Sequence, residues 1–189
     1  MPILSAEPAV FPDDLLTQTD PLQLPPGRWT VLHVRPRQEK SLARELVSQE
    51  IPFFLPLSPR SSMIRGRKLT AYLPLFDGYL FLFSEAGAVH AALTTRRVAN
   101  VLAVPDQGRL WSDLRRLHGL IASGLPLTPE PSLVAGQSVE ITSGPLTGFR
   151  GRVLRAASGS RFVVEVDFIG RAASVLCDGM TLRPVADQL

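Results

Sequence analysis

Short hydrophobic runs alternate with amphipathic stretches over the first two thirds of the chain. Four of these runs are rich in aromatic and β-branched residues, which predicts β-strands at 29–34, 53–57, 79–83 and 98–104. The run at 79–83 follows the turn-forming pair Asp77-Gly78 and consists of aromatic and aliphatic residues only. It therefore predicts a strand that is buried on both faces or that offers one face to a partner.

Between these runs the apolar positions follow a helical spacing. In 38–50 they recur at i, i+1, i+4 and i+5, and charged residues of both signs cover the other side. A short helix is predicted at 86–93, and a third helix is expected to begin at the capping residue Ser112 and to end near Gly124. This mixed order of elements predicts an α+β fold, in which a small antiparallel sheet carries helices on one side.

The last third of the chain has a different pattern, in which short strand-like segments are separated by glycines. Such segments lie at 138–141, 151–154, 161–168 and 173–176. Short strands with a glycine at each corner predict a small β-barrel over 134–186.

Proline sets the expected boundaries of these regions. Six prolines in residues 1–28 oppose helix and sheet, which predicts a disordered lead. Three more in the stretch Leu125-Pro-Leu-Thr-Pro-Glu-Pro131 predict a semi-rigid linker over 125–133. We therefore expect an ordered domain at 29–124 before the linker and the barrel after it.

Composition narrows the class of protein without identifying it. The hydrophobic fraction is 45% and the charged fraction 20%, which predicts a packed core, and the net charge of +3 permits an acidic partner without requiring one. The only cysteine, Cys177, excludes an intrachain disulfide. With no signal peptide and no membrane-spanning run in the sequence, we expect a cytoplasmic monomer that does not bind membranes.

Positive charge is concentrated in one place. No acidic residue occurs between residues 51 and 76, whereas Arg60, Arg65, Arg67 and Lys68 all do, around a glycine that predicts a hairpin tip. These residues are suited to contact phosphates. An ordinary exposed turn would look the same in sequence.

Residues suited to catalysis or to cofactor binding do not form a recognisable pattern. The three histidines, His33, His90 and His118, have no metal-ligand spacing, and no nucleophile or phosphate-binding motif is present. We therefore expect no cofactor, no metal and no catalytic activity. A small enzyme with an unfamiliar active site is the alternative, and it would require a deep polar pocket.

The segment 136–153 resembles a KOW motif. It matches the pattern G-x-x-V-x-I-x-x-G-P-x-x-G-x-x-G-x-V, in which Gly144, Pro145, Gly148 and Gly151 are the turn and packing positions. The first half of the chain is similar to the amino-terminal (NGN) domain of the NusG family, at 29–32, 54–56 and 74–81. An NGN domain, a proline-rich linker and a KOW barrel follow each other in this order in NusG proteins.

This resemblance implies a transcription elongation or antitermination factor that works by binding. In NusG proteins the NGN domain binds the clamp helices of the largest RNA polymerase subunit through an apolar depression, which suppresses pausing and raises processivity. The resemblance implies that Phe76, Tyr79 and Phe81 contact the clamp helices. Tyr79 and Phe81 are two residues apart on the predicted strand and should therefore face the same side.

Segments 35–40, 64–68 and 74–76 are more similar to the specialised RfaH-like paralogues than to housekeeping NusG. That similarity implies action at specific operons and contact with non-template DNA by Arg35 and Arg96. It also implies that His90 contacts the polymerase β subunit, although alanines replace the two threonines that follow this histidine in those paralogues.

The KOW barrel of NusG contacts a small-subunit ribosomal protein or the termination factor Rho through a phenylalanine before Gly-Arg. Here Phe168-Ile169-Gly170-Arg171 moves the aromatic residue back by one position. The β-branched, glycine-punctuated sequence favours a permanent barrel over one that refolds into helices. The alternative to a polymerase-binding factor is an RNA- or ribosome-associated KOW protein.

Overall fold

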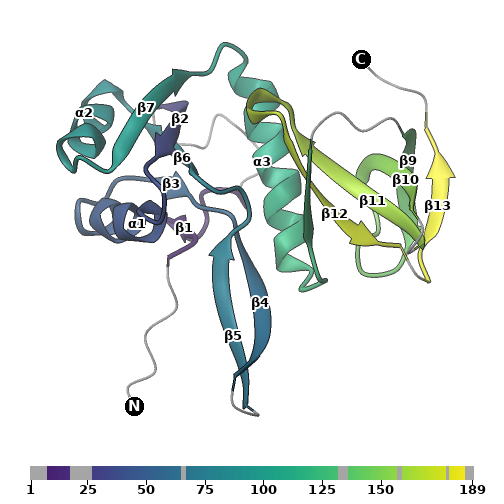
Figure 1. Cartoon of the computed structure of the whole chain (residues 1–189). Coiled ribbons are helices and arrows are strands. Elements are labelled where there is room, and N and C mark those ends of the chain that lie inside the picture. The colour runs from purple at the N-terminus through teal and green to yellow at the C-terminus, as the bar shows by residue number, and fades with distance from the viewer. Residues whose placement is uncertain are drawn as a thin grey trace. The chain divides into compact units, whose positions relative to one another are not determined.

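The computed structural model describes residues 8–17, 27–64, 67–131, 136–156, 159–177 and 179–185. The chain forms two compact units, residues 1–107 and 108–189. The helices and strands of both units are labelled in Figure 1. No helix in the described part of the chain is both long enough and apolar enough to cross a membrane.

An antiparallel sheet of five strands, in the order β1-β3-β6-β2-β7, forms the first unit. The strands are β1 (Val10–Phe11), β2 (Arg28–Val34), β3 (Phe53–Phe54), β6 (Tyr79–Ser84) and β7 (Val98–Ala103). Each of the four predicted hydrophobic runs contributes a strand to this sheet, but the predicted strand 53–57 is reduced to Phe53–Phe54. The predicted mixed fold with an antiparallel sheet is therefore confirmed.

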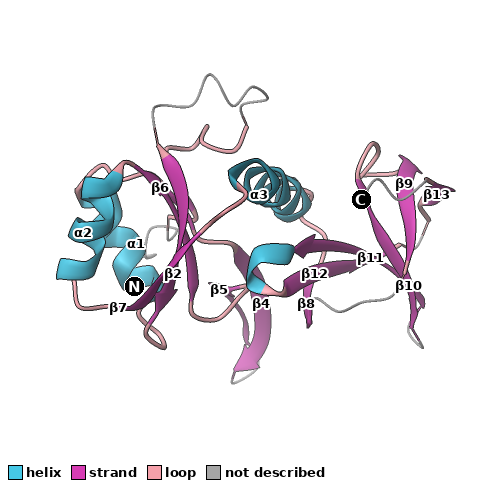
Figure 2. Cartoon of the chain, turned by 90° about the horizontal axis from the view of Figure 1, so that it is seen from above, coloured by secondary structure: helices cyan, strands magenta, loops and turns pink. Residues whose placement is uncertain are grey.

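Helices α1 (Glu39–Ser48) and α2 (Ala86–Thr94) lie on the same side of the sheet (Figure 2). Their apolar stripes pack on the side chains that alternate strand positions direct to that face, such as Leu32 and Val34 of β2 and Leu80 and Leu82 of β6. The intervening positions of β2 and β6, which include His33, Tyr79 and Phe81, face the opposite side.

Residues 8–17 correct the prediction of a disordered lead. Strand β1 pairs with β3, the amide of Leu55 donates to the carbonyl of Ala9 at 2.6 Å, and Leu15 and Leu16 are buried. The hydrophobic residues between the prolines therefore contribute to the first unit. Residues 1–7 and 18–26 of the predicted lead lie outside the described residues.

Strands β4 (Leu57–Ile64) and β5 (Arg67–Pro74) form a separate two-stranded sheet. This hairpin extends away from the five-stranded sheet (Figure 1). The predicted hairpin is present, and its tip, residues 65 and 66, lies outside the described part.

Helix α3 (Gln107–Ala122) starts five residues before the predicted cap at Ser112. The side-chain amide of Gln107 holds this start in place. Its oxygen accepts a hydrogen bond from the backbone N–H of Trp29 at 2.6 Å, and its nitrogen donates to the backbone carbonyl oxygens of Trp29 and Val104, at 3.0 and 2.9 Å. This first residue of the helix is held by a segment 78 positions away in sequence, a contact that local patterns do not reveal.

The second unit contains an antiparallel sheet of six strands, in the order β13-β9-β10-β11-β12-β8. They are β8 (Thr128–Pro131), β9 (Gln137–Ser143), β10 (Arg150–Ala156), β11 (Gly159–Val166), β12 (Arg171–Leu176) and β13 (Thr181–Pro184). Among the described residues the edge strands β8 and β13 do not pair with each other, so closure into a barrel remains a prediction. The core of the sheet includes Ile141, Phe162 and Val166, each fully buried.

Two boundary predictions are corrected by this unit. The predicted linker 125–133 contains strand β8, whose Thr128 and Glu130 lie opposite Ser174 and Ala172 of β12. The division between the units falls at the start of α3 and not in the linker. Helix α3 packs against the connection between β9 and β10, because a Cβ added at Gly119 would lie 2.6 Å from the ring of Phe149.

Candidate functional site

The turn that leads into β6 is fixed by contacts with β2 and α1. Gly78 has φ +79°, a conformation that glycine adopts without strain, and its carbonyl oxygen accepts from the N–H of Val34 at 2.8 Å. The N–H of Gly78 donates to the carboxylate of Glu39 at 2.9 Å. Glu39 is only 5% exposed, so the first turn of α1 places a buried charge against this turn. The start of β6 is thereby held in one position.

Tyr79, the first residue of β6, lies opposite His33 of β2 on the sheet face that turns away from α1 and α2. The two rings have centroids 5.5 Å apart and planes inclined by 35°. His33 is exposed and Tyr79 is partly exposed. The pair therefore forms an aromatic surface, open to solvent, at one end of the sheet.

The other two predicted clamp contacts are buried. Phe81 is fully buried and its ring stacks on that of Phe54, with centroids 6.3 Å apart, and Phe76 is 3% exposed. Tyr79 and Phe81 share a face, as alternation along a strand requires, but Phe81 lies between β3 and β2 whereas Tyr79 begins its strand. Of the three predicted residues, only Tyr79 offers surface in this conformation.

Two of the predicted DNA-contacting residues lie near this end of the sheet. The N–H of Arg35, directly after β2, donates to the carbonyl oxygen of Arg97 at 2.8 Å, which brings Arg35 beside the loop that contains Arg96. Both side chains are exposed, as is that of Arg37. Arg37 and Arg96 have φ of +63° and +59°, which is uncommon for residues other than glycine. Three exposed arginines therefore lie in the loops at the end of the sheet where β6 starts.

The neighbouring Arg97 has a structural role. Its guanidinium group donates to the carboxylate of Glu45 at 3.3 Å and to the side-chain carbonyl of Gln38 at 2.7 Å. These contacts tie the loop before β7 to α1. The loop that presents Arg96 is thus anchored on the helical layer.

The remaining predicted contacts lie elsewhere. His90 is exposed on α2, in the helical layer, and is not brought together with Tyr79. Arg65 lies outside the described residues, and Arg67 and Lys68 are placed only as positions at the start of β5.

The predicted KOW residues form the connection between β9 and β10. Gly144 and Gly148 have φ of +101° and +87°, and the N–H of Gly148 donates to the carbonyl oxygen of Ile141 at 2.8 Å. At Gly151 an added Cβ would lie 2.8 Å from the ring of Phe162, and Pro145 is exposed in the turn. The glycines of this motif therefore serve backbone geometry and close packing.

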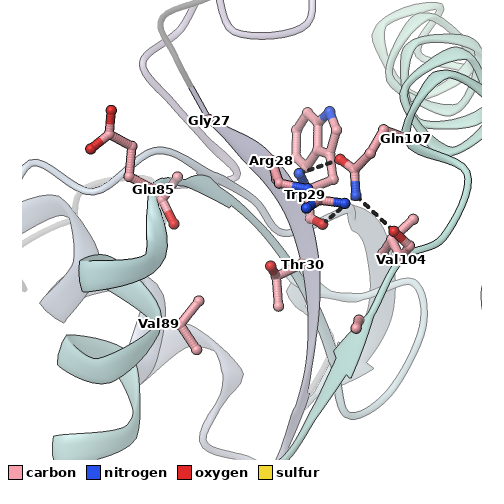
Figure 3. Close-up of a pocket in the computed structure, with 10 residues that line it drawn as sticks. Gly27, Arg28, Trp29, Thr30, Glu85, Val89, Val104 and Gln107 are labelled. Atoms are coloured by element: carbon pink, nitrogen blue, oxygen red, sulfur yellow. Dashed lines mark hydrogen bonds between the residues drawn. The ribbon is translucent and has the colours of Figure 1, made fainter.

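Sequence reasoning did not find a groove at the other end of the first sheet. The groove has a volume of about 640 Å³ and is lined by residues of β2, β6, α2 and β7 and by Val104, which follows β7; Thr30 and Val89 are among them (Figure 3). Two buried polar atoms at its wall, Trp29 Nε1 and Ser84 Oγ, make no hydrogen bond. No local pattern marks these residues, because the groove is assembled from strand ends that are distant in sequence. Within the described ranges, no three His, Cys, Asp or Glu side chains are grouped so as to hold a metal ion.

Comparison with known proteins shows a similarity over part of the chain. The family model described as "transcription termination factor nusG" matches residues 27–116. A solved structure described as "Domain interaction in Thermotoga maritima NusG" is 18% identical, with a TM-score of 0.46, and the match covers 80% of this chain and 93% of that one. The MjSpt4:Spt5 complex is 16% identical, with a TM-score of 0.28, and the match covers 84% and 99% of the two chains. No curated protein matches. The segment that matches the NusG model, 27–116, contains every residue predicted to contact polymerase or nucleic acid.

Proposed function

We propose that this chain is a NusG-type transcription factor that binds RNA polymerase through its first unit and increases the processivity of transcription. The match of residues 27–116 to the NusG family model carries this proposal. The surface around Tyr79 and His33 supplies the physical support, because an aromatic pair with neighbouring exposed arginines is suited to a protein interface next to nucleic acid.

In this proposal Tyr79 is the accessible anchor for the clamp helices of the largest polymerase subunit. Phe76 and Phe81 contribute to the same contact from beneath, where they hold the sheet face on which Tyr79 sits. Arg35 and Arg96 contact the non-template strand, and His90 contacts the β subunit from the helical layer. The second unit, with its KOW motif, binds a small-subunit ribosomal protein or Rho. The chain acts as a specialised, RfaH-like factor at particular operons.

The test is capture of RNA polymerase by the wild-type chain and by Tyr79→Ala. Truncation of an aromatic anchor costs on the order of 2 kcal/mol, so Kd should rise about 30-fold. Tyr72→Ala is the matched control, because Tyr72 is the only other tyrosine and is 53% exposed on the hairpin. Phe81→Ala would be a poor probe, since loss of a buried phenylalanine costs about 3–5 kcal/mol of folding stability.

Equal recovery of polymerase with Tyr79→Ala and wild type would remove the proposed clamp contact. Failure of the wild-type chain to recover polymerase, together with salt-dependent binding of structured RNA, would favour an RNA-associated KOW protein instead. A transcription assay on a pause-containing template then measures whether the bound factor raises read-through.

A further inference from the structure

Strand β7 forms an open edge of the first sheet. It is the last strand in the order β1-β3-β6-β2-β7, and among the described residues no strand pairs with its outer side. Its sequence, Val-Ala-Asn-Val-Leu-Ala, contains neither a charged residue nor a proline, which are the residues that usually block the addition of a strand. A strand of this length extends about 20 Å. The outer side of β7 is therefore able to receive another strand.

The backbone of β7 directs hydrogen-bonding groups to this outer side at alternate residues. The N–H of Val34 in β2 donates to the carbonyl oxygen of Gly78 at 2.8 Å, on the side of β6, and Leu32 points the same way by alternation. Val101 lies opposite Leu32 and therefore directs its N–H and carbonyl oxygen away from β2. Its N–H donates to the side-chain oxygen of Asn100 at 2.9 Å. This local acceptor can be exchanged for the carbonyl oxygen of an added strand.

Helix α2 lies beside β7 and exposes an apolar flank. Its Val89 lines the groove together with Ala103 of β7 and the adjoining Val104 (Figure 3). Leu93 follows Val89 by one helical turn on the same stripe and is 44% exposed. The helix, Ala-Gly-Ala-Val-His-Ala-Ala-Leu-Thr, contains no aspartate, glutamate, lysine or arginine. A helix of this composition is normally covered on all sides, so the exposed Leu93 indicates a contact surface.

A second copy of the chain fits this edge about a two-fold axis. With the axis at Val101, antiparallel pairing sets Val101 opposite the same residue of the other copy, and Ala99 opposite Ala103 of the other copy. All the side chains that meet are uncharged, so no like charges are brought together. The pairing also sets the start of each β7 beside the end of the other.

The same arrangement brings Leu93 to the groove of the other copy. Leu93 lies shortly before the start of β7, whereas the groove lies at the end of β7, with Thr30 and Val89 in its walls. Thr30 shares its sheet face with Leu32, which packs in the core beneath the helices. The leucine and the groove therefore lie on the same face of the sheet, and a groove of about 640 Å³ admits a leucine side chain.

We propose that this chain forms a symmetric homodimer in which the two β7 strands pair and Leu93 of each copy enters the groove of the other. The fitting partner is a second copy because the chain supplies both halves of the contact, an exposed leucine and an apolar groove, at opposite ends of one strand. One strand and one helix flank make a contact smaller than the standard of about 800 Å² per partner, so the affinity should be micromolar.

This inference goes beyond the proposed function and does not rest on polymerase binding. It also differs from the monomer expected from the sequence. That expectation had no information on the pairing of β7, which depends on the position of this strand at the end of the sheet.

The test measures the molar mass of the full chain by sedimentation equilibrium, from low to high micromolar concentration. We expect monomer to convert to dimer within this range. Leu93→Glu should raise the dissociation constant at least about tenfold, because it removes two leucine contacts and sets each introduced carboxylate beside Glu85 in the groove of the other copy. Val101→Pro removes the outward donor at the centre of the pairing, a change that an edge strand tolerates, and should abolish the dimer.

Leu176→Glu is the matched control, because Leu176 is comparably exposed, at 40%, on β12 of the second unit. It should leave the dissociation constant within about threefold, and circular dichroism of the variants should match the wild type. A chain that stays monomeric over the whole range would overturn the inference. A dimer that Leu93→Glu leaves intact, or that Leu176→Glu weakens equally, would do the same. If Val101→Pro does not fold, the comparison of Leu93→Glu with Leu176→Glu decides.

Discussion

Glu39 offers a direct test of how the turn before Tyr79 is held. Its carboxylate, 5% exposed, accepts the N–H of Gly78 at 2.9 Å, and Gly78 is itself buried. Glu39→Ala removes the acceptor and leaves that N–H without a partner in a place that water does not reach. Glu39→Gln keeps a carbonyl acceptor and removes only the charge.

The cost can be worked from this geometry. A hydrogen bond to a charged group contributes about 1.5–3 kcal/mol, and the acid in the first turn of α1 adds about 0.3–1 kcal/mol through the helix dipole. Both substitutions also remove a charge whose burial is unfavourable, and this gain offsets part of the lost stabilisation. We therefore expect Glu39→Ala to lower the free energy of unfolding by about 2 kcal/mol and Glu39→Gln by about 1 kcal/mol. A loss of 2 kcal/mol corresponds to about 8–16 °C in the melting temperature of a domain of this size.

The assay is urea unfolding followed by the fluorescence of Trp29, which is 2% exposed, in a Trp111→Phe background. Glu45→Gln is the control, because Glu45 lies on the same helix but is 37% exposed in its ion pair with Arg97, and such pairs contribute at most about 1 kcal/mol. If Glu39→Ala destabilises no more than Glu45→Gln, the buried hydrogen bond does not hold the turn and the reasoning is refuted.

Two further predictions concern the second unit. Gly151→Ala would place a Cβ 2.8 Å from the ring of Phe162, so thermal unfolding should show a loss of about 1–3 kcal/mol in the free energy of unfolding. Gly87→Ala is the control, because an added Cβ there has nothing within 4 Å and should not destabilise the chain. An unchanged melting temperature for Gly151→Ala would contradict the packing argument. Burial lowers the pKa of His118 below its ordinary 6.5, so the unfolded chain takes up a proton first as pH falls. Stability should therefore decline as pH drops below 6.5 towards the folded pKa, and the same pH dependence in His118→Gln would show that this residue is not responsible.

Local sequence patterns predicted those strands and helices whose own residues show an apolar run or a helical spacing. Strands β2, β6 and β7 and helices α1 and α2 follow from apolar runs and from helical spacing. Strand β1 was missed because its two residues stand among prolines and become a strand only by pairing with β3. The start of α3 was misplaced because Ser112 imitates a cap, whereas the first residue, Gln107, is held by Trp29.

The candidate site was predictable in its residue types but not in its exposure. The sequence placed Tyr79 and Phe81 on one face, but the alternation of side chains along a strand does not determine which of the two is exposed to solvent. His33 was not predicted to contribute, and only the pairing of β2 with β6 brings it to Tyr79. The proximity of Arg35 to Arg96 likewise depends on a backbone contact between segments about sixty residues apart.

Strand β8 has a consequence for the behaviour of this protein in concentrated solution. It forms one edge of the six-stranded sheet, and its sequence is Thr-Pro-Glu-Pro. An exposed edge normally offers a row of amide donors to which a strand of another molecule can add. Pro129 and Pro131 occupy alternate positions of β8, so both remove a donor from the same side of the strand. The prolines that predicted a linker from the sequence thus protect this edge of the sheet against aggregation.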